Sequence, residues 1–287
     1  MTIEFIGHVD DGPAPGGRAA QEAEAAGFDR VILTSGSSSP DPWLVAAEAL
    51  RATTRLKILI AHRPGVVAPT VAARKLATLD QFSGGRTSLQ VIAGWSTDDR
   101  HRDGDFLPED DRYARAREYL DILGRELTEP EPFDYEGVHY QVRDAFSEIR
   151  PVQTPLIFSD GTSPEALELA ARYSDVHVTP AEPLADFARI RQAATEHGRT
   201  IEFAIELDPV LGDTEEEARE RANATGPDVA PGTLLVGTPR TVADTITDYH
   251  RKTGATRFVL GARHHTHTEL GERLLPLVRE RTAGGSR

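Results

Sequence analysis

The sequence predicts an α/β protein in which eight parallel strands, each followed by a helix, close into a (β/α)8 TIM barrel. Short apolar segments rich in Val, Ile and Leu alternate with longer stretches of helical periodicity, and eight such pairs can be traced along the 287 residues. Strands joined by helical crossovers run parallel. Eight repeats with no obvious domain break favour a closed barrel over an open doubly wound sheet.

The predicted strands are the short apolar segments of this alternation. They are expected at Ile3–His8, Arg30–Thr34, Lys57–His62, Thr87–Ala93, Leu156–Ser159, Val176–Thr179, Glu202–Leu207 and Arg257–Gly261.

The predicted helices begin and end at typical capping residues. Gly27 follows the first helix at the usual position of a left-handed cap. Asp41 precedes a proline and Ser163 precedes Pro-Glu, both of which are helix-start patterns, and Gly198 closes a later helix. The helices are expected at Gly17–Ala26, Asp41–Ala52, Pro69–Phe82, Tyr113–Leu127, Ser163–Tyr173, Leu184–His197, Thr214–Ala224, Thr241–Lys252 and Thr268–Arg281.

We expect residues 1–287 to form a single domain with one insertion. The segment Phe133–Val142, FDYEGVHYQV, alternates between apolar and polar residues around Glu-Gly, which predicts an inserted hairpin. The final residues, Thr282–Arg287, are expected to form a disordered tail.

The composition excludes several classes of function. The chain has no cysteine, so disulfides, Cys-ligated zinc, iron–sulfur clusters and thiol nucleophiles are excluded. A formal net charge of -14 argues against nucleic acid or an anionic membrane as the main partner. The chain shows no apolar run long enough to span a bilayer and no signal peptide at the N-terminus, so we expect a cytoplasmic protein.

Polar residues cluster where the predicted strands end. In a TIM barrel the active site lies at the carboxyl ends of the strands. These positions include His8, Asp160–Ser163, Asp208 and Arg263–His265. Because a metal site needs ligands gathered from several strands, the histidines grouped after the last strand do not predict one.

Six ordered segments resemble the bacterial luciferase-like flavin monooxygenases, and the alkanesulfonate branch in particular. They cover nearly the whole chain: SSPDPWLVAA, HRPGVVAPTVAARKLATLDQFSGGR (residues 62–86), DRYARAREYLDIL, FDYEGVHYQV, DGTSPEALELAA and LLVGTPRTVADTITDYHRKTGATRFVL. The resemblance implies a barrel that uses FMN.

The loop after the fifth strand fits the implied flavin phosphate. Gly161 allows close approach of the backbone, and Thr162 and Ser163 offer hydroxyl groups. The helix that follows presents unpaired N–H groups and the positive end of its dipole. The predicted cofactor-binding residues are Ser39, Ala93, Gly94, Tyr113, Asp160, Gly161, Thr162 and Ser163.

Some positions depart from the family pattern around the flavin. Glu109 stands four residues before Tyr113, where many relatives have a histidine. Ala93 replaces a threonine or asparagine near the flavin, and Ser39 occupies the place of a cysteine. A capping role for Ser39 is the alternative.

The substrate end departs further from the alkanesulfonate enzymes. Their Arg-x-His at the end of strand seven is Glu206-Leu207-Asp208 here, and Arg263 replaces a tyrosine after strand eight. Glu206 and Asp208 share one face of the strand, where they could act as an acid–base pair or form ion pairs with cations in the barrel wall. The predicted catalytic residues are His8, Trp95, Asp208, Arg263 and His265.

The resemblance implies a two-component monooxygenase. Reduced FMN from a separate flavin reductase would react with O2 to give a flavin peroxide that oxygenates a small organic substrate. A deazaflavin-dependent hydride-transfer oxidoreductase and a non-catalytic flavin-binding barrel are the alternatives. Relatives pair through helices beside the barrel, so a homodimer or homotetramer is expected, with Val71–Phe82 as the candidate surface.

Overall fold

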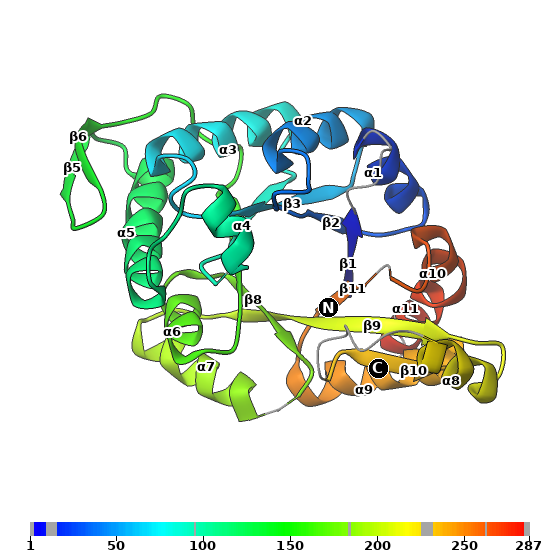
Figure 1. The fold of residues 1–287 in the computed structure, drawn as a ribbon. Helices are drawn as coiled ribbons and strands as arrows, with labels where there is room; N and C mark the ends of the chain where they lie inside the picture. Colours follow the sequence, from blue (N-terminus) through cyan, green and yellow to red (C-terminus); the bar gives the residue numbers. More distant parts are fainter. Residues whose placement is uncertain are drawn as a thin grey trace.

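Eight parallel strands form a closed barrel in the computed structural model (Figure 1). The structure describes residues 3–9, 16–94, 96–182, 185–224, 232–261 and 263–283. The barrel runs in the order β1 (Glu4–Val9), β2 (Arg30–Leu33), β3 (Lys57–His62), β4 (Thr87–Val91), β7 (Leu156–Asp160), β8 (Val176–Pro180), β9 (Glu202–Leu211) and β11 (Arg257–Leu260). Pairing of β8 with β9 closes it and confirms the predicted fold class.

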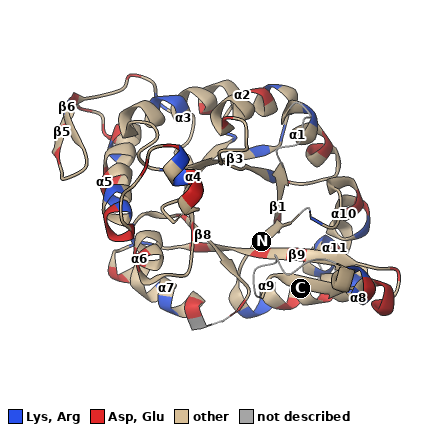
Figure 2. Ribbon diagram, in the orientation of Figure 1, with Lys and Arg blue, Asp and Glu red and all other residues tan. Residues whose placement is uncertain are grey.

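Helices surround the barrel on its outside. They are α1 (Gly16–Ala25), α2 (Pro42–Ala52), α3 (Pro69–Ser83), α5 (Glu109–Thr128), α6 (Pro164–Tyr173), α7 (Ala185–Glu196), α8 (Glu215–Ala224), α9 (Pro239–Thr253), α10 (His267–Arg273) and α11 (Leu275–Ala283). Side chains cap several of them as predicted: Asp41 accepts from the backbone N–H of Trp43 and Leu44, and Ser163 accepts from that of Ala166. Charged residues lie mostly on these helices (Figure 2).

The alternation along each strand divides the apolar core into two layers. On β1, Phe5 packs between the sheet and the helices, whereas Ile6 points into the barrel. The barrel interior is a compact cluster of buried residues: Ile6, Ile32, Leu59, Phe158, Val176, Val178, Ala204 and Val259. This filled interior leaves space for a ligand only near the ends of the strands.

Strand β9 is longer than the sequence predicts. It continues to Leu211, and its second half pairs with a strand that was not predicted, β10 (Leu234–Gly237). The prediction ended this strand at Leu207, before Asp208 and a proline. The extension forms because β10 supplies hydrogen bonds outside the barrel.

Three other differences concern short elements. Helix α4 (Thr97–Arg102) was not predicted because TDDRHR has no apolar periodicity, and it lies over the barrel opening (Figure 1). The last predicted helix is divided at Leu274 into α10 and α11. Thr282 belongs to α11, not to a tail, whereas residues 284–287 lie outside the described residues.

The predicted hairpin segment folds as a two-stranded antiparallel sheet. Its strands are β5 (Phe133–Glu136) and β6 (Gln141–Ala145), which pair with each other away from the barrel (Figure 1).

A buried charge cluster lies at the amino-terminal ends of three barrel strands. The Glu4 carboxylate accepts from Arg30 Nε at 2.7 Å and from Arg257 Nε at 3.0 Å, which joins β1 to β2 and β11. Arg30 is 3 % exposed and also contacts the Ser88 hydroxyl. Burial alone would raise the pKa of Glu4, but Arg30 and Arg257 outweigh it and lower that pKa.

We expect Glu4→Gln to lower the free energy of unfolding by about 2–4 kcal/mol, because it leaves a buried guanidinium without its counter-charge. Since the pKa of Glu4 is lower in the folded state, the stabilisation is present above pH 4.5 and is lost as the pH falls through the folded pKa. Urea denaturation at several pH values measures it. Glu22→Gln, which breaks the exposed pair with Arg18, is the control, and equal losses in both variants would contradict the prediction.

Candidate active site

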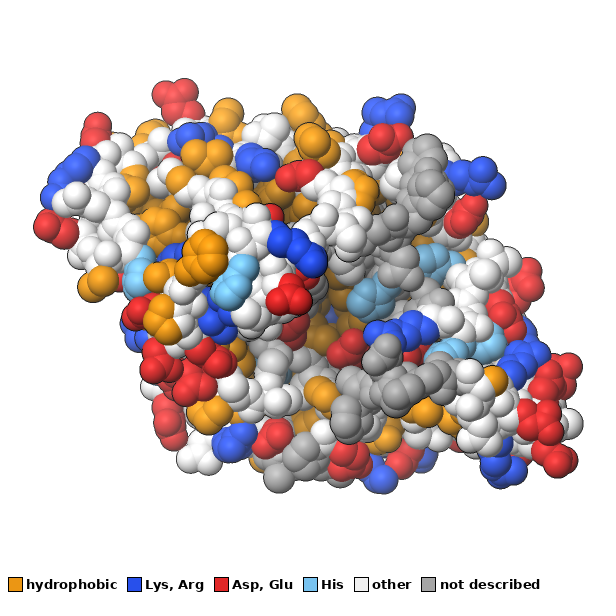
Figure 3. Space-filling view, in the orientation of Figure 1, with side chains coloured by type: hydrophobic (Ala, Val, Ile, Leu, Met, Phe, Trp, Pro, Cys, Tyr) orange, Lys and Arg blue, Asp and Glu red, His pale blue; other side chains and the backbone are white. Residues whose placement is uncertain are grey.

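A cavity of about 180 Å³ lies inside the carboxyl-terminal mouth of the barrel. Its polar lining consists of His8, Thr34, Gln90, Asp160 and Glu206. Its apolar lining consists of Ile32, Ala61, Ile92, Val178 and Val259. Figure 3 shows a hollow near the middle of this face, with hydrophobic and acidic side chains inside it. Strands from all around the barrel thus meet at one small polar site.

The cavity brings two carboxyl groups close together. Asp160 ends β7, and Glu206 lies two strands away on β9. Gln90 donates from Nε2 to Asp160 Oδ2 at 2.9 Å. Burial raises the pKa of Asp160 to about 6, and the Glu206 carboxylate adds to the rise, while the Gln90 hydrogen bond opposes it. Asp160 therefore exchanges a proton in the pH range where many enzymes work.

The loop between β7 and α6, Gly161–Ser163, forms a second polar cluster with Tyr113, directly after Asp160. Gly161 has a φ of 101°, a conformation that strains other residues, and an added Cβ would lie 3.0 Å from Ala166. The Ser163 hydroxyl accepts from the backbone N–H of Ala166 at 3.2 Å and donates to the Tyr113 hydroxyl at 3.4 Å. A Cβ on Gly94 would lie 3.2 Å from that same hydroxyl.

Five of the predicted cofactor-binding residues therefore lie together, next to Asp160, which lines the cavity. They are Gly94, Tyr113, Gly161, Thr162 and Ser163. Gly161 and Thr162 are exposed, so their backbone and hydroxyl groups are open to a ligand. Together with the positive end of the ten-residue helix α6, this arrangement fits a phosphate group.

Two other predicted cofactor-binding residues have local structural contacts. The carbonyl of Ala93 accepts from Arg112 Nε at 3.1 Å. Ser39 donates its backbone N–H to Gly36 at 3.1 Å within the loop between β2 and α2. Neither residue lines the cavity.

Of the predicted catalytic residues, only His8 is seen to line the cavity. Asp208 is 7 % exposed, and its Oδ2 lies 3.9 Å from His264 Nε2. The Asp208 side chain packs against the backbone of Gly261. A Cβ added to Gly261 would lie 2.6 Å from Asp208 Oδ1. Arg263 is exposed in the loop before α10, and Trp95 lies outside the described residues.

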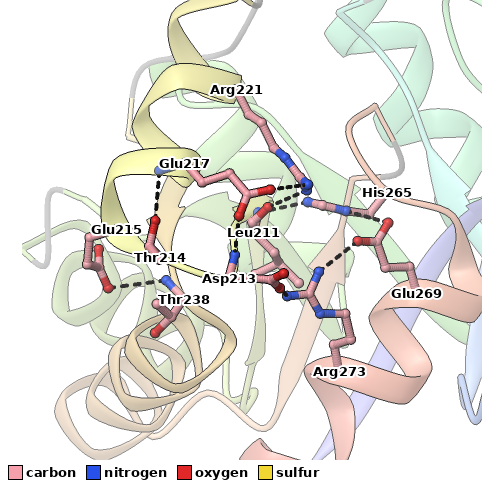
Figure 4. Close-up of polar contacts among 10 residues, drawn as sticks. All are labelled: Leu211, Asp213, Thr214, Glu215, Glu217, Arg221, Thr238, His265, Glu269 and Arg273. Carbon is pink, nitrogen blue, oxygen red and sulfur yellow. Dashed lines mark hydrogen bonds and ion pairs between the residues drawn. The ribbon is translucent and has the colours of Figure 1, made fainter.

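His265 holds secondary structure together at a place outside the cavity lining. Its Nε2 accepts from the backbone N–H of Leu211 at 2.7 Å, so the proton is on Nδ1, which lies 2.7 Å from Glu269 Oε2. Arg273 joins Glu269 to Asp213, so the end of β9 is tied to α10 (Figure 4). His265 is 4 % exposed and lies outside the cavity lining, so these contacts favour a structural role, and its predicted catalytic role stays a prediction.

Three cavity residues were not among the predicted catalytic or cofactor-binding residues: Thr34, Gln90 and Glu206. Glu206 was expected either to form an acid–base pair with Asp208 or to form an ion pair with a cation of the barrel wall; among the described residues it has no such cation, and its neighbour in the cavity is Asp160. The sequence signal that could have identified Gln90 is its place as a polar residue in a buried strand. It stands two residues after Ser88, a second polar residue that faces the barrel interior. The described part of the chain contains no cluster of His, Asp or Glu suited to a metal ion.

The family profile for luciferase-like monooxygenases matches residues 7–230. The chain belongs to the luciferase-like monooxygenase family. Family membership supports an oxidoreductase. No helix in the described part of this family member is long and apolar enough to cross a membrane.

Solved structures share the fold of this luciferase-like chain at low identity. A riboflavin lyase with modified FMN and riboflavin matches with a TM-score of 0.84 and 19% identity, over 98% of this chain and 92% of that one. A long-chain alkane monooxygenase matches with a TM-score of 0.82 and 19% identity, over 98% of this chain and 92% of that one. An F420-dependent secondary alcohol dehydrogenase matches with a TM-score of 0.82 and 19% identity, over 97% of this chain and 100% of that one. The closer relation to the alkanesulfonate branch stays a prediction.

We expect Asp160→Asn to stabilise the protein at pH 8, by up to about 3 kcal/mol. The pKa of Asp160 rises from 3.8 to about 6 on folding, so the carboxyl favours the folded state below pH 4, and this contribution is lost as the pH rises through 6. An amide has no charge to bury. Thermal unfolding of both proteins between pH 4 and 8 measures the difference, and a loss of stability at every pH would contradict the assignment.

Proposed function

We propose that this family member is a monooxygenase that uses reduced FMN, supplied by a separate flavin reductase, and O2 to oxygenate a small organic substrate. The observation that carries the proposal is the adjacency of two sites. The loop Gly161–Ser163, whose geometry suits a phosphate, directly follows Asp160 in the lining of a cavity that has both apolar and acidic residues. Family membership supports the same reading.

The residues of the loop and of the cavity have separate roles in this proposal. Thr162, Ser163 and the N–H groups that begin α6 would hold the flavin phosphate, with the Tyr113 hydroxyl beside them. Bound reduced flavin supplies the electrons that activate O2. Ile92 and Val259 exclude water from the reacting groups, and His8 with the cavity carboxyls orients the substrate and holds protons.

A deazaflavin-dependent hydride transfer is the second candidate. One observation favours it: an F420-dependent secondary alcohol dehydrogenase and an F420-dependent tetrahydromethanopterin reductase share this fold over 97% and 96% of the chain. Both coenzymes carry phosphate, so the loop at Gly161 does not distinguish them. Binding and oxygen consumption do.

We expect the purified protein to bind reduced FMN more tightly than the reduced deazaflavin coenzyme in an anaerobic titration, and to consume O2 once a substrate is present. Gly161→Ala should weaken FMN binding about tenfold, because its backbone conformation costs about 1–2 kcal/mol with a side chain. Gly198 has a φ of 70°, and an added Cβ there would meet no other atom of the described residues, so Gly198→Ala is the control for backbone strain far from the site. Preference for the deazaflavin would support the second candidate, and binding of neither would contradict both.

We also propose that copies of the chain associate through α2 and α3. Leu44 on α2 is 74 % exposed, and Phe82 on α3 is 81 % exposed, with Val71 also exposed nearby on α3. Figure 3 shows hydrophobic side chains along the upper edge of the molecule, where α2 and α3 lie in Figure 1. Exposed apolar residues grouped on adjacent helices are typical of interfaces.

We expect light scattering to give a dimer or tetramer for the wild type and a smaller mass for Leu44→Asp with Phe82→Asp, because buried carboxylates oppose association. Val138→Asp changes a residue that is 91 % exposed in the hairpin and should leave the mass unchanged. A monomeric wild type, or an unchanged mass in the double variant, would contradict the proposal.

A further inference from the structure

Three side chains of the mouth cavity present hydrogen-bond acceptors. Gln90 donates its amide N–H to Asp160, but its Oε1 is buried with no hydrogen-bond partner among the described residues. Asp160 and Glu206 present carboxyl oxygens to the same space. Among the described residues, the side chain of Glu206 forms neither a hydrogen bond nor an ion pair, whereas its backbone belongs to the β9 ladder. An unpartnered buried acceptor destabilises the protein until a donor reaches it.

The charge of the cavity points in the same direction. Two carboxyl groups line it, and its lining within the described part of the chain includes neither lysine nor arginine. Elsewhere in the barrel, Glu4 is compensated by Arg30 and Arg257. The cavity therefore attracts a cation and repels a substrate that carries a sulfonate or a carboxylate.

An organic cation fits the cavity better than a metal ion does. The described residues provide no group of three His, Asp or Glu side chains arranged for a metal. The rest of the lining is largely apolar: Ile32, Ala61, Ile92, Val178 and Val259 alternate with the polar residues around the mouth. An alkylammonium group combines three N–H donors and a positive charge with an apolar chain, which matches three acceptors in a cavity with apolar lining.

We propose that this cavity binds the protonated nitrogen of an aliphatic amine substrate, through Gln90 Oε1 and the carboxylates of Asp160 and Glu206. Asp160 and Glu206 select the substrate by charge, and Gln90 orients both the amine and Asp160. This inference rests on the proposed oxygenase function, because it names the substrate class of the same site.

The test is isothermal titration calorimetry of the FMN-loaded protein at pH 8 with three probes of equal chain length: n-butylammonium, 1-butanol and n-butanesulfonate. We expect n-butylammonium to bind at least about tenfold more tightly than either of the others, as for a charge-assisted hydrogen bond. Asp160→Asn and Glu206→Gln should each reduce that preference several-fold. Glu148→Gln, which removes the same charge from an exposed position away from the cavity, should keep it.

The outcomes separate this inference from the proposed function. A protein that binds FMN but shows no preference for n-butylammonium, or binds none of the three probes, overturns the inference and leaves the flavin function in place. A preference that survives in the Asp160→Asn, Glu206→Gln double variant also overturns it. If FMN does not bind while the ammonium preference is present in the unloaded protein, the cation site stands and the oxygenase function fails. Thermal unfolding of each variant shows that the fold is retained.

Discussion

Closure of the parallel sheet by the pairing of β8 with β9 is the constraint on which the rest of this structure depends. An open sheet with the same strand order would leave β8 and β9 far apart. Once the sheet is closed, the carboxyl ends of eight strands surround one small space, and His8, Gln90, Asp160 and Glu206 face it from four different strands. The site is thus a product of backbone hydrogen bonding first and of side-chain chemistry second.

The two ends of the barrel treat buried carboxylates in opposite ways. At the amino-terminal end, Glu4 lies between Arg30 and Arg257, and its pKa is lowered. At the mouth, Asp160 lies near Glu206 without a cation in the cavity lining, and its pKa is raised to about 6. The first arrangement stabilises the fold. The second lowers stability near neutral pH and leaves a charge available to a ligand, as is common at functional sites.

The extension of β9 is held by a polar network that lies outside the cavity lining. His265 and Arg221 contact the two backbone groups of Leu211, and Glu269 and Arg273 continue the network to α10 (Figure 4). Histidine after a barrel strand suggests catalysis when only the sequence is known. Here, the hydrogen bond that Nε2 accepts from Leu211 and the contact of Nδ1 with Glu269 favour a role in the scaffold.

The sequence by itself determined the barrel, the eight strands and the loop at Gly161–Ser163, because these depend on local periodicity, capping and backbone conformation. It also located His8 and Asp160 at strand ends. Only the tertiary structure decided that Glu206 faces Asp160, that Gln90 joins them, and that Asp208 and His265 do not line the cavity. The physical reason is that strand closure and the β9–β10 pairing set which side chains meet, and both are contacts between residues far apart in the chain.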